Sequence, residues 1–125
     1  MKQGFVKVAS ATPRIRVADP VYNAQVICEQ AKEAAEHGAK IVVFPELCIT
    51  GYTCNDLFLQ ELLLEKAKEA LLTIAEETGQ LETLFLVGLP VDKDGRLYNV
   101  AAVLYRGRIP VSYTHLRAHE TSLHL

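Results

Sequence analysis

The sequence has no segment that suggests export or a membrane span. Near the N-terminus, Lys7 interrupts a short apolar run, and Arg14 and Arg16 follow soon after. This pattern does not match a secretory signal, and no stretch approaches the roughly 20 apolar residues that a spanning helix needs. We therefore expect no membrane partner.

The sequence also lacks an excess of charge of one sign and has few cysteines. Thirteen Lys and Arg residues stand against fifteen Asp and Glu residues, so the formal net charge is -2. No large positive field is available to attract phosphate backbones, and nucleic acid is not an expected partner. Cys28, Cys48 and Cys54 are odd in number, which indicates reduced thiols and, without an export signal, the cytoplasm.

What the sequence does contain is the pattern of a single α/β domain. At 125 residues and 50% hydrophobic content it should fold around one packed core. Residues 5–11 and 41–44 have the composition of strands, and a helix between them starts at 19–20 and ends at 37–38. The later elements expected are a helix from about residue 56 or 57 to 78, strands over 84–89 and 97–105, and turns at 92–95 and 106–107, the second leading into a fifth strand.

The candidate for chemistry is Glu46. The run from Phe44 to Leu47 places this carboxylate just beyond the end of a buried strand, where open α/β sheets bind ligands. We expect it to be partly desolvated there, which raises the pKa of a carboxyl group and suits it to accept a proton. The alternative is a loop in which Glu46 caps a helix or meets solvent.

The residues around Glu46 carry a family resemblance. Phe44-Pro45-Glu46-Leu47 followed by Thr50-Gly51-Tyr52 resembles the nitrilase, or carbon-nitrogen hydrolase, superfamily. The wider sequence up to residue 109 resembles the amino-terminal glutaminase domain of the glutamine-dependent NAD synthetase family. The resemblance implies the amino-terminal half of an α-β-β-α sandwich, in which helices cover the outer faces of two packed sheets. The other segments that carry it are 11–13, 17–19, 22–23, 48–58, 87–90 and 97–103.

A catalytic triad of Glu, Lys and Cys is implied by the resemblance. Glu46 matches the general base. The matching Lys would fall a few residues beyond Pro110, where this chain has His115, and the nucleophilic Cys belongs to a later strand that is absent. We therefore expect this chain itself to hydrolyse nothing. Tyr52 either lines the glutamine pocket or the ammonia exit, or anchors the loop on the second helix.

None of the three cysteines is expected to act as the nucleophile. Cys28 lies on the apolar face of the first helix and should belong to the core. Cys48 is two residues from Glu46, so both lie in one loop and cannot readily meet across a substrate. Cys54 has no basic neighbour in sequence that would lower its pKa.

The resemblance also implies the partners. Glutamine is the substrate, and ammonia passes to a synthetase domain of the same full-length chain, which amidates deamido-NAD. ATP and magnesium would bind that absent domain, so this part has no cofactor or metal, and the full-length protein should be a homo-oligomer. Two alternatives remain: a stand-alone amidase or carbamoylase of the same superfamily, and a small non-enzymatic α/β binding module.

Residues 111–125 differ from the rest of the chain. His115, His119 and His124 follow one another without a helical or strand period, and the pattern does not support a zinc site. Back-translated codon by codon, residues 111–121 resemble the transposase end and adapter of DNA sequencing libraries. We expect residues 1–109 to be a partial carbon-nitrogen hydrolase domain and residues 110–125 to be an adapter-derived tail.

Overall fold

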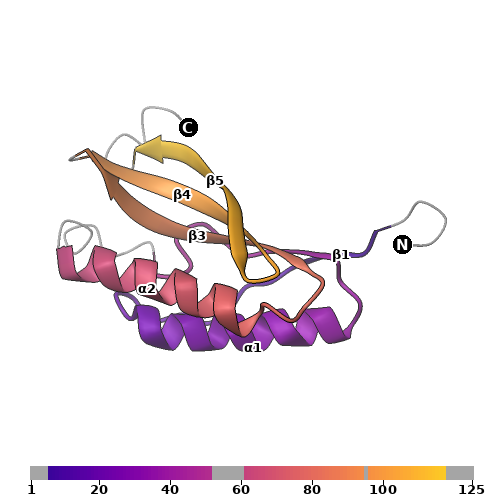
Figure 1. Ribbon diagram of the computed structural model, residues 1–125. Helices are drawn as coiled ribbons and strands as arrows, with labels where there is room; N and C mark the ends of the chain where they lie inside the picture. The colour runs from indigo at the N-terminus through magenta and orange to yellow at the C-terminus, as the bar shows by residue number, and fades with distance from the viewer. Residues whose placement is uncertain (1–5, 52–60, 95, 118–125) are drawn as a thin grey trace.

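In a computed structural model of the protein, two helices lie on one face of a five-stranded sheet. The structure describes residues 6–51, 61–94 and 96–117. Figure 1 shows the helices as one layer and the strands as the other. In chain order the elements are β1 (Val8–Ser10), α1 (Pro20–Glu36), β2 (Ile41–Val43), α2 (Glu61–Glu77), β3 (Leu84–Lys93), β4 (Arg96–Tyr105) and β5 (Arg108–Arg117).

The sheet is mixed. The strands are ordered β1-β2-β3-β4-β5, with parallel pairing from β1 to β3 and antiparallel pairing from β3 to β5. Parallel neighbours need a crossover, which α1 and α2 supply, whereas antiparallel neighbours are joined by tight turns. Asp94, Arg106 and Gly107 have φ values of 54°, 51° and 80°, the left-handed backbone that tight hairpin turns require.

The limits of α1 follow from local chemistry. The Asp19 side chain accepts a hydrogen bond from the backbone N–H of Tyr22 at 3.1 Å, and Pro20 occupies the first turn, where its missing N–H costs nothing. At the other end the chain passes through Gly38, whose φ is 87°. Both predicted ends of this helix are confirmed. The predicted start of α2, at about residue 56 or 57, lies outside the described residues.

The core lies between the sheet and the helices. Val42, Phe85 and Leu104 are in register across β2, β3 and β4, and all three are almost fully buried on the helix side. The small residues Ala31 and Ala67 are fully buried on α1 and α2, respectively, and let the helices pack closely. Neither helix in the described part of the chain is long and apolar enough to cross a membrane.

Two strands are longer than the sequence predicts. β3 continues to Lys93, because its last residues pair with the start of β4 in a regular hairpin. β5 runs to Arg117, into the stretch that shows no strand period. The edge of β4 offers unpaired backbone groups, and pairing with them does not require alternating side chains. Sequence periodicity therefore missed the second half of β5.

The second face of the sheet is partly bare near β1 and β2. Val8 and Val43 point away from the helices and are 62% and 44% exposed. Exposed apolar side chains on a flat sheet favour association. This uncovered face corresponds to the expected inner face of a sandwich.

We predict that Val43→Lys reduces self-association of the 125-residue chain, because it places a charge on the bare sheet face. The measurement is the sedimentation coefficient over a range of concentrations. Leu72→Lys is the matched control, since Leu72 is 60% exposed but lies on a helix. Equal effects of the two substitutions would contradict a specific role of the sheet face.

Candidate functional site

The loop after β2 carries Glu46 across the sheet. Phe44 still pairs with β3, since its N–H donates to the carbonyl of Leu86 at 2.9 Å. The chain then turns, and Leu47 adopts a φ of 52°. The carbonyl of Leu47 accepts hydrogen bonds from the N–H groups of Thr50 and Gly51 at 3.2 and 2.6 Å. Glu46 therefore stands at the beginning of a compact turn, beyond the end of β2, as predicted.

The backbone of this loop lies directly on Gly88 of β3. A Cβ at Gly88 would meet the backbone N of Leu47 at 2.5 Å and the Cα and C atoms of Glu46 at 3.0 Å. The Gly88 carbonyl also accepts a hydrogen bond from the N–H of Ile49 at 3.2 Å. Gly88 is thus a glycine because another backbone occupies the space of its side chain.

Asn23 fixes the other side of the loop. This residue of α1 is fully buried, and its Oδ1 accepts a hydrogen bond from the N–H of Arg16 at 2.6 Å. Its Nδ2 donates to the carbonyls of Arg16 and Ile49, both at 2.7 Å. The N–H of Ala18 adds a bond to the carbonyl of Thr50 at 2.8 Å. One buried amide therefore ties the segment before α1 to the loop after β2.

Sequence reasoning missed the role of Asn23. The residue entered only as part of the family resemblance. A signal was present, because Asn23 lies among the apolar positions of α1, where a polar side chain must find buried partners. Those partners, at residues 16 and 49, are not visible from local sequence.

The environment of Glu46 differs from the expectation of partial desolvation. The Glu46 side chain is exposed. The physical reason is the bare sheet face beside it, where Val43 is exposed as well. Tyr52 and Cys54, the other loop residues singled out from the sequence, lie outside the described residues.

The two described cysteines are unsuited to nucleophilic attack. Both are free thiols and both are buried. Burial, together with the nearby carboxylate of Glu77, raises the pKa of Cys28 to about 11. Burial also raises the pKa of Cys48 to about 11, and its Sγ lies 3.7 Å from the Gly88 carbonyl oxygen. The thiolate is the nucleophile, so both groups should react only slowly at neutral pH, and neither suits the nucleophile's role, as the sequence indicated.

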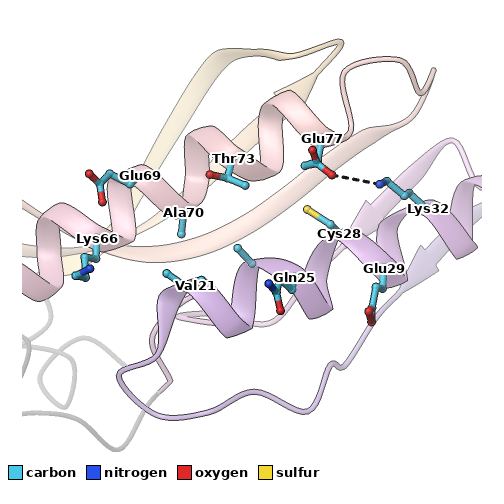
Figure 2. Close-up of a pocket in the computed structure, with 11 residues that line it drawn as sticks. Val21, Gln25, Cys28, Glu29, Lys32, Lys66, Glu69, Ala70, Thr73 and Glu77 are labelled. Atoms are coloured by element: carbon cyan, nitrogen blue, oxygen red, sulfur yellow. Dashed lines mark hydrogen bonds and ion pairs between the residues drawn. The ribbon is translucent and has the colours of Figure 1, made fainter.

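A cavity of about 770 Å³ lies between α1 and α2, away from the Glu46 loop. Figure 2 shows its lining side chains on the two helices, with Lys32 and Glu77 forming an ion pair at 3.4 Å. The lining contains Cys28 but no residue of the segment 44–51. The cavity is therefore not formed by the loop that carries Glu46, and its size alone does not make it the candidate active site.

Among the described residues, neither a metal-binding cluster nor a free N-terminus of α1 is available for magnesium or a phosphate group. No group of three His, Cys, Asp or Glu side chains among them is placed to hold a metal. The N-terminus of α1 is occupied by the carboxylate of Asp19, which would repel a phosphate. No step of a reaction is therefore assigned to either group in this chain.

A family model decides the relationship: the model of the carbon-nitrogen hydrolases matches residues 7–121. The chain belongs to the carbon-nitrogen hydrolase family. The match continues past residue 109, and the predicted boundary between domain and tail stays a prediction. Hydrolase membership disfavours the alternative of a non-enzymatic binding module.

Curated relatives of this carbon-nitrogen hydrolase chain are glutamine-dependent NAD(+) synthetases. The protein from Mycobacterium tuberculosis strain H37Rv is 37% identical over 116 residues, which are 90% of this chain and 17% of the relative. The protein from Xylella fastidiosa strain 9a5c is 35% identical over 112 residues, 87% of this chain and 20% of the relative. The chain thus spans about a fifth of the length of these relatives.

Solved structures confirm the predicted fold of the hydrolase chain. The glutamine-dependent NAD(+) synthetase of Cytophaga hutchinsonii superposes with a TM-score of 0.81 at 29% identity, covering 87% of this chain and 18% of the other. An amidase from Nesterenkonia sp. superposes with a TM-score of 0.76 at 23% identity, covering 94% and 45%. The second likeness shows the fold alone. The chain is the amino-terminal half of a nitrilase-type sandwich.

We predict that Gly88→Ala destabilises the chain by on the order of 1–3 kcal/mol. The new methyl group would clash with backbone atoms, which cannot move away as a flexible side chain can. The measurement is the free energy of unfolding in urea. Gly79→Ala is the control, since its Cβ would meet carbonyl oxygens at no less than 3.3 Å. A Gly88→Ala chain as stable as the control variant would contradict the close packing of the loop.

We predict slow alkylation of Cys28 and Cys48 in the folded chain at neutral pH. A pKa of about 11 in place of 9.0 lowers the fraction of each thiol that is ionised at neutral pH. The alkylation rate of each residue should therefore be about 100-fold lower in the folded chain than in the urea-unfolded chain. The rate should rise with pH towards that pKa. Mass spectrometry of iodoacetamide-treated peptides measures both residues separately. Equal rates in the folded and unfolded chain would refute the burial of the thiols.

Proposed function

We propose that this chain is the amino-terminal part of the glutaminase domain of a glutamine-dependent NAD synthetase. The observation that carries the proposal is the match to such synthetases, which covers 90% of this chain at 37% identity but 17% of the relative. The position of Glu46 beyond β2, in a loop held from two sides, supports it.

Glu46 is the general base of the proposed reaction. Its carboxylate takes the proton of a cysteine thiol, and the thiolate attacks the carbon of the glutamine side-chain amide. A lysine ammonium stabilises the resulting oxyanion, and Glu46 returns the proton to the amide nitrogen, which leaves as ammonia. Water then cleaves the thioester to give glutamate and free enzyme. The cysteine comes from a part of the full-length protein that this chain lacks, and the lysine would stand where this chain has His115.

The fold supports Glu46 in this role through its backbone. General-base catalysis needs the carboxylate within hydrogen-bond distance of the thiol, so the loop must be held in place. The contact with Gly88 and the hydrogen bond from Asn23 to Ile49 hold it on opposite sides. Glu46 is exposed in this chain, and we propose that other parts of the full-length protein cover it.

The remaining parts of the reaction belong to the whole protein. Glutamine is the proposed substrate, and Tyr52 is proposed to line its pocket or the ammonia exit. Ammonia would pass to a synthetase domain of the same polypeptide, which binds ATP and magnesium and amidates deamido-NAD. We propose the cytoplasm as its location and a homo-oligomer as its assembly.

A stand-alone amidase is the weaker alternative. It would use the same Glu46 chemistry, and the Nesterenkonia amidase shares the fold. The sequence relatives described above are synthetases, and that observation favours the glutaminase. Reading the source gene beyond residue 109 for a synthetase half separates the two.

We predict that Glu46→Gln in the uninterrupted protein lowers glutamine hydrolysis about 10³-fold, because the amide cannot accept the thiol proton. The measurement is ammonia or glutamate release with glutamine as substrate. Glu36→Gln, at an exposed position of α1, is the matched control and should retain full activity.

The 125-residue chain provides a further comparison and should show no turnover. Glutamine hydrolysis by this chain alone, or full activity of the Glu46→Gln protein, would contradict the proposal.

A further inference from the structure

The side-chain oxygen of Asn99, on β4, is a buried hydrogen-bond acceptor for which the described residues supply no donor. The residue is 5% exposed, and within residues 6–51, 61–94 and 96–117 its Oδ1 has no hydrogen-bond partner. Folded proteins rarely leave a buried carbonyl oxygen in this state, because it has lost its hydrogen bonds to water. The atom therefore marks a place where a donor is expected.

Asn99 lies between two contacts that hold the Glu46 loop on the sheet. Alternate residues of a strand share a face, so Leu97 is on the same face as Asn99. Leu97 packs in a cluster with Leu47 of the loop. On the other side of Asn99 along this face, β4 pairs with the part of β3 that contains Gly88. The backbone of Glu46 lies on Gly88. The unsatisfied oxygen is thus on the sheet face that supports the candidate base.

The neighbouring strand is irregular at the same point. Asn99 pairs with Leu116 and Val100 pairs with Thr114, which leaves residue 115 as the extra residue of a β-bulge. Bulges redirect a side chain and are common beside active sites. His115 stands at this position, where the family resemblance implies the catalytic lysine.

We propose that Asn99 is a positioning residue for amide hydrolysis. Its Oδ1 accepts a hydrogen bond from the ammonium group of a lysine at position 115 of the uninterrupted protein, and holds that group beside the Glu46 loop. This inference rests on the proposed function. An ammonium group has three donors, so one bond to Asn99 fixes its direction and leaves the others for the developing oxyanion. Asn99 itself touches no reacting atom.

Three predictions distinguish this role in the uninterrupted protein. The source gene should encode lysine at position 115. Asn99→Leu, which removes the acceptor at similar volume, should lower kcat for glutamine about 100-fold with KM little changed, because the ammonium group is misplaced. Asn99→Asp retains the acceptor and should keep kcat within about tenfold of the parent while the basic limb of the pH profile moves up, since the added carboxylate raises the lysine pKa.

The controls separate this inference from a structural effect and from the proposed function. Gln25→Leu removes an exposed carboxamide from α1 and should leave activity unchanged. Asn99→Leu at parental activity, equal losses in Asn99→Leu and Asn99→Asp without a pH shift, or an apolar or acidic residue at position 115 would overturn the positioning role. A parent protein that hydrolyses another amide but not glutamine would refute the glutaminase, and the Asn99 variants would then be measured with that amide.

Discussion

The contact between two backbones at Gly88 determines where the candidate base can lie. The loop of Glu46 and Leu47 crosses β3 at a distance that leaves no room for a Cβ atom. Two backbones can come this close only where one of them has a glycine. The contact between them is more rigid than a contact made by a flexible side chain. The position of Glu46 is therefore set by the sheet itself and not by the conformation of a long exposed loop.

The buried amide of Asn23 complements this contact from the helix side. Its three hydrogen bonds join α1, the segment before α1 and the loop after β2. Each such bond contributes about 1 kcal/mol, and an unpaired partner left behind costs more. The same loop is thus held by packing on one side and by polar bonds on the other, and tilting it would break both sets of contacts.

Much of the fold could be predicted because its signals are local. Asp19 and Pro20 fix the start of α1, Gly38 ends it, and the run around Val42 marks a buried strand. The site was predictable only in part. The place of Glu46 follows from the end of β2, but its exposure depends on what covers the sheet face beside it.

The roles of the supporting residues depend on long-range contacts. Asn23 bonds to a loop 26 positions away, and Gly88 meets a backbone segment from before α2. The unsatisfied oxygen of Asn99 becomes apparent only when its surroundings are known. No local pattern encodes these contacts, whereas the family resemblance carried Asn23 as part of a motif without its physical reason.

The order of the strands also affects how the chain folds during its synthesis. β3 pairs with β2 on one side and β4 on the other, and it follows both helices in the chain. A polypeptide leaves the ribosome from its N-terminus, so α1 and α2 emerge before the strand that lies at the centre of their sheet. The later hairpins join near neighbours and can close quickly. The nascent chain is therefore most prone to aggregate just before residues 84–93 emerge.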